Sequence, residues 1–192
     1  MQKNFCQVFE KRLISLEFQI INKDLAVSAW SFNVNKKSCA NPQLYADYLK
    51  FSALNDYKDG KNVTHVLLNY IDNKPEIVGF FSLRATSYQI NFYDTDDDAT
   101  EYHPACEIQY LAVSEKYEKQ GYGKELMAQA VSTILEISEK TMAIEYLVLR
   151  SEKKAINFYK RFDFNEIKKC GKVPNESWNK NCTPMLCKLK GN

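Results

Sequence analysis

Hydrophobic and polar residues alternate along several stretches of the first half of the chain. Alternation over residues 13–20 predicts a strand with one buried face. Residues 63–71 and 76–85 predict two more strands, which the turn residues Asp72-Asn73-Lys74-Pro75 join into a hairpin. Residues 88–104 are largely polar, and we expect an excursion there rather than a strand or helix. The first half therefore predicts an antiparallel sheet.

Apolar residues recur at helical spacing in three places. The first stretch begins at Asn41-Pro42 and ends at Asp59-Gly60. The second covers residues 122–140 and has one apolar face: Leu126, Met127, Ala130, Ile134 and Ile137. The third covers residues 152–162 and also has one apolar face: Ala155, Phe158, Tyr159 and Phe162. Three helical segments are therefore expected.

The second half of the chain alternates strand and helix. Residues 105–113 and 143–149 predict strands on either side of the helix at 122–140, and short strands follow at 164–168 and 182–189. Because a helical crossover joins parallel strands, the strands around residues 109 and 146 should form a parallel pair. We expect one α/β domain over residues 1–192, with a mixed sheet that is antiparallel at its N-terminal strands and flanked by helices.

Composition and charge exclude several classes of protein. Aromatic residues make up 13% of the chain, too many for a disordered protein. The formal net charge is only +2, so any nucleic-acid contact must come from the placement of basic residues. No apolar run approaches the roughly 18–20 residues of a membrane span, and the residues after Met1 lack a signal-peptide core. We therefore expect a cytoplasmic protein without membrane contact.

Cysteines and histidines give little support for a metal site. None of the six cysteines forms a C-x-x-C pair, and only His65 and His103 are available beside them. Reduced thiols are the simpler expectation for a cytoplasmic protein. The acidic run over residues 94–98 lacks the Gly and Glu that a calcium loop requires, which favours a solvated acidic loop. We expect no metal.

The loop before the helix at 122–140 carries the clearest chemical signal. Gly121 and Gly123 stand where this helix begins, so a ligand can approach the main chain closely. Free N–H groups and the positive end of the helix dipole suit a phosphate or pyrophosphate, and Lys119 and Lys124 add positive charge. An ordinary turn, in which the glycines only relieve strain, is the alternative. Neither G-x-G-x-x-G nor a P-loop is present.

Two motifs resemble those of the GNAT superfamily of N-acetyltransferases. Glu107-Ile-Gln-Tyr-Leu-Ala-Val-Ser, followed by Glu118-Lys-Gln-Gly-Tyr-Gly123, is similar to its motif A, whose loop reads [QR]-x-x-G-x-[GA]. Ala155-Ile-Asn-Phe-Tyr-Lys-Arg-Phe-Asp-Phe looks like the A-x-x-F-Y-x-x-x-G-F signature, with Asp163 in place of Gly. In element order the resemblance covers about residues 63–190. It implies a GNAT-like sheet with a splayed parallel pair and an acetyl-CoA-binding core over about residues 105–165.

The resemblance also implies where acetyl-CoA would bind as co-substrate. The pantetheine arm would pair with the main chain of one strand: Leu111, Ala112 and Val113. The pyrophosphate would be held by amides of the following loop: Lys119, Gln120, Gly121, Tyr122, Gly123 and Lys124. A main-chain amide near Leu111 would polarise the thioester carbonyl.

Direct attack of an amine on the thioester calls for an acid and a base. Tyr159 is the candidate acid for the leaving thiolate, because a phenol with a pKa of about 10 is protonated at neutral pH. A plain core aromatic is the alternative. Glu107 is the candidate base, at the position of the strand glutamate of the histone-acetyltransferase branch. A water chain could serve instead, and Tyr110 could shape the amine site.

Three functions fit these motifs. The leading hypothesis is an N-acetyltransferase that acts on a primary amine of a small molecule, peptide or protein. Residues 38–50 also resemble a helix of GNAT toxins that acetylate aminoacyl-tRNA, so tRNA is an alternative substrate, although the near-neutral charge fits it poorly. The departures at Glu118, at Lys153, where many members carry Asn, and at Asp163 keep open an acyl-CoA-binding sensor without catalysis. The acceptor, the acyl-chain length, an antitoxin partner and the choice between monomer and homodimer stay open.

Overall fold

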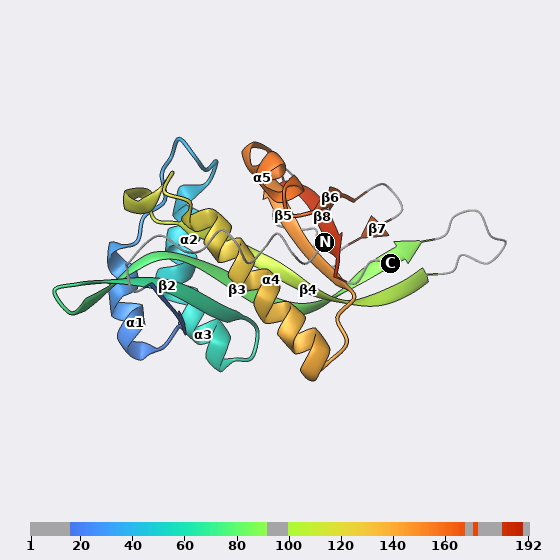
Figure 1. Cartoon of the computed structure of the whole chain (residues 1–192), viewed down its shortest axis with the longest axis horizontal. Coiled ribbons are helices and arrows are strands. Elements are labelled where there is room, and N and C mark those ends of the chain that lie inside the picture. The colour runs from blue at the N-terminus through green and yellow to red at the C-terminus, as the bar shows by residue number, and fades with distance from the viewer. Residues whose placement is uncertain (1–15, 92–99, 168–170, 173–181, 190–192) are drawn as a thin grey trace.

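One sheet runs through the computed structural model, which describes residues 16–91, 100–167, 171–172 and 182–189. The strand order is β1-β2-β3-β4-β5-β8-β6, and β7 pairs with β3 (Figure 1). The strands are β1 Glu17–Ile20, β2 Val63–Ile71, β3 Lys74–Asn91, β4 Thr100–Val113, β5 Tyr146–Glu152, β6 Asn165–Glu166, β7 Gly171–Lys172 and β8 Cys182–Lys188. Among the described strands, only β4 and β5 are paired in parallel. The mixed sheet with one parallel pair is confirmed.

Helices cover both faces of this sheet (Figure 1). They are α1 Lys23–Ser28, α2 Pro42–Asp47, α3 Ala53–Lys58, α4 Tyr122–Lys140 and α5 Ile156–Lys160, with short helical turns η3 Ala29–Ser31, η4 Tyr48–Ser52, η5 Glu115–Tyr117 and η6 Lys153–Ala155. Strand β2 shows why two layers form, because successive side chains of a strand point to opposite faces. Leu67 packs into the core with α4, whereas Val66 and Leu68 pack with α1 to α3.

A β-bulge interrupts β4 next to the parallel pair. Ser82 of β3 pairs with Tyr110, whereas the next residue, Leu83, pairs with Ile108. Gln109 is therefore an extra residue in β4, and such an insertion bends the strand and increases its twist.

The bulge marks the point at which β4 and β5 separate. Their parallel pairing runs as far as Ile108 and Leu149. Beyond it, residues 111–113 pair with β3 alone among the described strands, while β5 continues along β8 until Glu152 pairs with Cys182. The splayed parallel pair implied by the family resemblance is therefore present.

The predicted polar excursion at 88–104 is wrong. Strand β3 continues to Asn91 and β4 begins at Thr100, with Tyr88 paired to His103. This part of the hairpin extends beyond the helices, so it lacks the single buried face that produces alternation of apolar and polar residues in a sequence. Tyr88 is nevertheless buried, and it packs against Tyr146. The acidic run at 94–98 lies outside the described residues.

Other elements also differ from the prediction. Helix α1 was not expected; its N-cap is Asn22, whose Oδ1 accepts the N–H groups of Asp24 and Leu25 at 3.0 Å. Strand β5 begins three residues later than predicted and extends to Glu152, because all its residues pair with β8. The predicted helix at 152–162 shortens accordingly to η6 and α5.

The described residues include four of the six cysteines and the helix α4. Four cysteines are free thiols there: Cys39, Cys106, Cys182 and Cys187. Within the same residues no helix is long and apolar enough to cross a membrane.

Candidate active site

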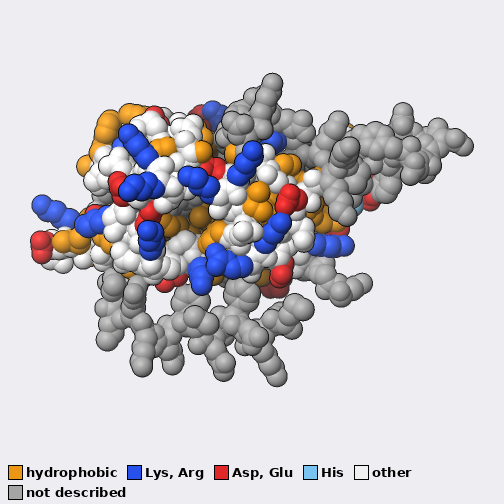
Figure 2. All heavy atoms as spheres, turned by 90° about the horizontal axis from the view of Figure 1, so that it is seen from above, with side chains coloured by type: hydrophobic (Ala, Val, Ile, Leu, Met, Phe, Trp, Pro, Cys, Tyr) orange, Lys and Arg blue, Asp and Glu red, His pale blue; other side chains and the backbone are white. Residues whose placement is uncertain are grey.

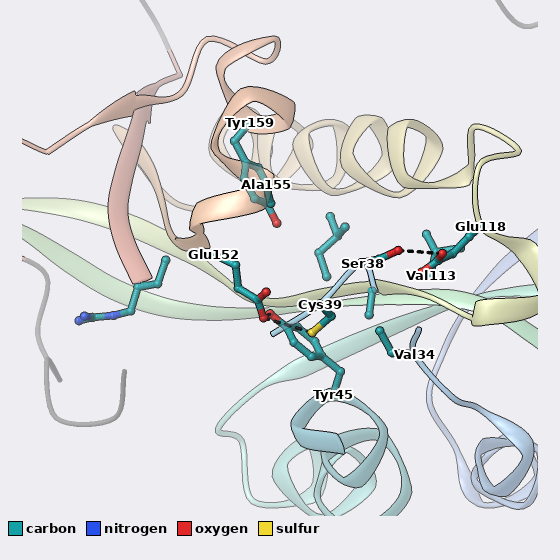
Figure 3. Close-up of a pocket in the computed structure, with 12 residues that line it drawn as sticks. Val34, Ser38, Cys39, Tyr45, Val113, Glu118, Glu152, Ala155 and Tyr159 are labelled. Atoms are coloured by element: carbon teal, nitrogen blue, oxygen red, sulfur yellow. Dashed lines mark hydrogen bonds between the residues drawn. The ribbon is translucent and has the colours of Figure 1, made fainter. Parts of the chain in front are cut away.

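A pocket of about 150 Å³ lies where β4 and β5 separate (Figure 3). Four parts of the chain contribute to it: α2 with the loop before it, the end of β4 with the loop that follows, the end of β5, and α5 with η6. Its lining is Val34, Ser38, Cys39, Tyr45, Leu111, Ala112, Val113, Glu118, Arg150, Glu152, Ala155 and Tyr159. The structure therefore brings Tyr159 together with the predicted pantetheine-binding residues of β4.

Tyr159 points from α5 into this pocket (Figure 3). Burial, and then the negative charge of Glu152, raises the pKa of the Tyr159 hydroxyl well above its ordinary value. The hydroxyl is therefore protonated throughout the neutral range and can donate a proton. The tyrosine also packs edge-on against Phe158 and Phe164, so its ring contributes to the core as well.

Glu152 is a pocket residue that sequence reasoning missed. Its carboxylate accepts hydrogen bonds from the Ala40 N–H at 2.7 Å, the Cys39 thiol at 3.2 Å and the Tyr45 hydroxyl at 3.3 Å. The sequence predicted a helix that begins at residue 152, whereas Glu152 is the last residue of strand β5. The usable signal was a charged residue just after an apolar run, because ligands bind beyond the carboxyl ends of parallel strands.

The groups that bind Glu152 are neutral donors. Burial, followed by the hydrogen bond to Glu152, raises the pKa of the Cys39 thiol to about 12. Burial and the same carboxylate raise the pKa of the Tyr45 hydroxyl far above its ordinary value. Both groups therefore keep their protons at neutral pH, and neither serves as a nucleophile there.

The glycine loop has the backbone geometry of an anion site. Lys119 and Gly121 adopt positive φ angles of 61° and 97°, and such turns gather N–H groups into a concave nest. Lys124 N–H bonds to the Gly121 carbonyl at 2.9 Å. Within the described part of the chain, the N–H groups of Gly121, Tyr122 and Gly123 have no hydrogen-bond partner. Three of the six main-chain amides that we expect to hold the pyrophosphate therefore have no protein acceptor among the described residues.

The space around this loop fits a bound pyrophosphate. A side chain at Gly121 would meet no atom within 4 Å, and one at Gly123 would meet only Phe158 at 3.7 Å and Val113 at 3.9 Å. Lys119, Gln120 and Lys124 are exposed. The Tyr122 side chain is buried against Tyr117, so this residue offers its main chain rather than its hydroxyl.

Two of the three departures from the family motifs, Glu118 and Asp163, keep the local structure. Glu118 accepts hydrogen bonds from Asn35 Nδ2 at 3.2 Å and Ser38 Oγ at 2.9 Å, which ties the glycine loop to the loop before α2. Asp163 has a φ of 63°. That angle suits Gly best and is tolerated by Asp, so the turn after α5 forms without the glycine.

Glu107 lies outside the lining of the pocket. Its side chain is 1% exposed and forms an ion pair with Arg84, whose Nε donates to Oε2 at 2.7 Å. The carboxylate already has a cationic partner, which favours a structural role. His103, expected in a loop, lies in β4 and is hydrogen-bonded to Glu145 at 2.7 Å. Among the described residues, no group of His, Cys, Asp and Glu could hold a metal ion.

Comparison with known proteins identifies the family. The family model described as "Acetyltransferase (GNAT) domain" matches residues 64–166, more than half of the chain. No curated protein matches the sequence.

Several solved structures share the fold. A tyrosine-to-phenylalanine variant of the toxin AtaT has a TM-score of 0.72 at 14% identity, covering 91% of this chain and 89% of that one. A corresponding variant of KacT has a TM-score of 0.68 at 15% identity, with coverages of 91% and 95%. AtaT complexed with acetyl-methionyl-tRNAfMet has a TM-score of 0.65 at 16% identity, with coverages of 88% and 93%.

The family match includes the glycine loop, the splayed strands and Tyr159, whereas the pocket residues from the loop before α2 and from α2 lie outside it. The chain belongs to the GNAT acetyltransferase family and is an acetyl-CoA-dependent N-acetyltransferase.

Proposed function

We propose that this protein transfers an acetyl group from acetyl-CoA to a primary amine by direct attack in the pocket between β4 and β5. One observation carries the proposal: the pocket places the protonated Tyr159 hydroxyl beside the unpaired edge of residues 111–113. The amine nitrogen would form a bond to the acetyl carbon while the carbon–sulfur bond breaks. Tyr159 would then supply a proton to the leaving thiolate.

The test is a thiol-release assay with acetyl-CoA and a panel of polyamines, aminoglycosides, short peptides and methionyl-tRNA. Amine-dependent thiol release supports the proposal. Acetyl-CoA binding without release to any amine of the panel would favour the acyl-CoA-binding sensor. A single domain over residues 1–192 and a cytoplasmic location stay predictions.

Acetyl-CoA would occupy the diverging edge of β4 and the glycine loop. Residues 111–113 have main-chain groups without a strand partner on the β5 side among the described strands. The free N–H groups of residues 121–123, the N-terminus of the 19-residue helix α4 and the exposed Lys119 and Lys124 would hold the pyrophosphate. A main-chain amide near Leu111 would polarise the thioester carbonyl.

Gly123→Val should weaken acetyl-CoA binding about tenfold or more, as expected when a main-chain hydrogen bond to a charged group is blocked. Isothermal titration calorimetry measures the affinity. Gly123 is the cleaner position, because Gly121 has a φ of 97° and any side chain there would also strain the fold. Ser132→Val, at an exposed position of α4, controls for the helix cost of a β-branched residue. Equal affinities of a folded Gly123→Val protein and this control would refute the pyrophosphate assignment.

A second candidate for the acceptor is the aminoacyl end of a tRNA. The similar structures include AtaT complexed with acetyl-methionyl-tRNAfMet. Lys and Arg side chains gather on the face that carries α5 and the loop before α2 (Figure 2). Six exposed lysines near the pocket take part in no ion pair among the described residues: Lys36, Lys37, Lys119, Lys124, Lys153 and Lys154. Local basic charge would thus bind phosphates despite the near-neutral total.

If tRNA is the acceptor, the protein should acetylate methionyl-tRNA, and its expression should arrest growth. Transfer of labelled acetyl groups to the tRNA is the measurement. Binding should weaken steeply between 50 and 200 mM salt, because lysines displace counterions from the phosphates. Lys37→Gln and Lys153→Gln should each reduce that salt dependence by about one unit of its logarithmic slope. Normal growth with a folded protein, and no labelled tRNA, would leave small amines or peptides as the acceptor.

A further inference from the structure

The pocket lining holds two carboxylates that form no ion pair among the described residues, Glu118 and Glu152, and Glu152 is the one close enough to Tyr159 to raise its pKa. Glu152 takes part in none of the ion pairs among the described residues. All three of its hydrogen-bond donors are neutral: the Ala40 N–H, the Cys39 thiol and the Tyr45 hydroxyl. They orient the carboxylate without forming an ion pair with it. A partly buried charge of this kind is costly unless a ligand of opposite charge compensates it.

The other two acidic groups near the site are already engaged differently. Glu118 binds Asn35 and Ser38 and links two loops. Glu107 is paired with Arg84 outside the pocket. Glu152 alone combines a place in the lining, an orientation fixed by several donors, and proximity to Tyr159 (Figure 3).

We propose that Glu152 binds the ammonium form of the acceptor and removes its proton before attack. This inference rests on the proposed function and makes it specific: the acceptor is cationic, and its amine enters beside Glu152 on the side of Cys39 and Tyr45. The three neutral donors hold the carboxylate in place, so no competing cation of the protein must leave when the substrate binds.

The proton balance is closed. The acceptor ammonium gives one proton to Glu152 and becomes a neutral amine. The amine nitrogen bonds to the acetyl carbon, the carbon–sulfur bond breaks, and the thiolate takes the Tyr159 proton. The new amide nitrogen loses its second proton to the Tyr159 oxygen, directly or through water, and Glu152 releases its proton to solvent. One amide, one free thiol and one proton result.

Several titratable and charged groups surround Glu152 and can affect the pH dependence of the reaction. Cys39 and Tyr45 face it across the pocket, and both stay protonated at neutral pH. Other groups come from β5, β8, α5 and η6: Arg150, Cys182, Tyr159 and Lys154. Burial raises the pKa of four of these groups, Cys39, Tyr45, Tyr159 and Cys182, so they keep their protons near neutral pH and a change of the pH profile there reports the amine.

The experiment compares Glu152→Gln with wild type in the thiol-release assay, using the best acceptor of the panel. We expect the KM of the acceptor to rise about ten- to a hundredfold at pH 7, as for loss of a charge-assisted hydrogen bond. The affinity for acetyl-CoA and the melting temperature should stay close to wild type, because Gln can still accept the Ala40 N–H. The defect should shrink toward pH 9, where an α-amine with a pKa of about 8 is neutral without help.

Glu145→Gln is the matched control, because Glu145 is a half-buried, hydrogen-bonded carboxylate just before the other end of β5. It should leave the KM of the acceptor unchanged. Should Glu152→Gln fail to fold, wild type itself provides the second measurement. The isosteric alcohol of the acceptor, with a hydroxyl in place of the amine, should bind at least about tenfold more weakly than the ammonium form.

The outcomes separate this inference from the function on which it rests. Wild-type turnover together with an unchanged KM and pH profile in Glu152→Gln overturns the role of Glu152 alone, as does equal binding of amine and alcohol. Acetyl-CoA binding without acetylation of any amine overturns the proposed function, and the inference falls with it. A raised KM that recovers at high pH supports both.

Discussion

Tyr159→Phe should lower kcat by about ten- to a thousandfold, the range expected when one positioned proton donor is lost. The substitution removes one oxygen and leaves the ring contacts with Phe158 and Phe164 in place. Acetyl-CoA affinity and melting temperature should therefore stay near wild type, because the missing group acts mainly in the transition state. Since the pKa of Tyr159 is raised, wild-type activity should show no loss from its deprotonation up to about pH 10.

Tyr88→Phe is the control for this experiment. Tyr88 is a buried tyrosine in the far part of the β3–β4 hairpin. The substitution there removes the same hydroxyl oxygen at a position away from the pocket. Its kcat should match wild type. Wild-type turnover in a folded Tyr159→Phe protein would return Tyr159 to a packing role and leave the thiolate to be protonated by water.

Arg84→Met should lower the free energy of unfolding by about 3 kcal/mol or more, because it leaves the buried carboxylate of Glu107 without a cation. Urea denaturation followed by circular dichroism measures the change. The double variant Arg84→Met with Glu107→Leu removes both charges and should recover most of the lost stability. Equal stability of Arg84→Met and wild type would show that the ion pair contributes nothing.

Glu107→Gln tests the base predicted from the family resemblance. If Glu107 were the base, its loss in rate would shrink at high pH, as expected for Glu152→Gln. The ion pair with Arg84 instead favours a loss of stability with an unchanged shape of the pH–rate profile. Measuring the two glutamine variants side by side therefore decides which carboxylate accepts the proton of the amine.

Strong local patterns predicted the elements that we expect to bind acetyl-CoA. Helix α4 has the predicted bounds, because a one-sided apolar stripe over 19 residues leaves little freedom in where the helix lies. Strand β2 also has its predicted bounds. The loop between β4 and α4 was visible because its glycines serve a local purpose: Gly121 takes a positive φ that other residues adopt only under strain. Family motifs in the same segment then led to acetyl-CoA.

Local patterns were weakest where long-range pairing sets the structure. The end of β5 is a strand because β8 pairs with it, more than thirty residues later in the chain. The extension of the β3–β4 hairpin has no helix over it, so its residues show no alternation. In both places the competing local interpretation, helix or loop, was reasonable for the residues considered alone.

The sequence by itself determined the family, the bounds of α4 and β2 and the glycine loop, and it offered Tyr159 as a candidate, because each rests on residues close together in the chain. Only the tertiary structure decided which partners the carboxylates in and near the pocket have. Glu152 receives its hydrogen bonds from residues about a hundred positions earlier, and Glu107 is paired with Arg84 on the neighbouring strand. The partner of a carboxylate decides whether its charge is free to bind a substrate, and these partners meet only when the sheet has formed.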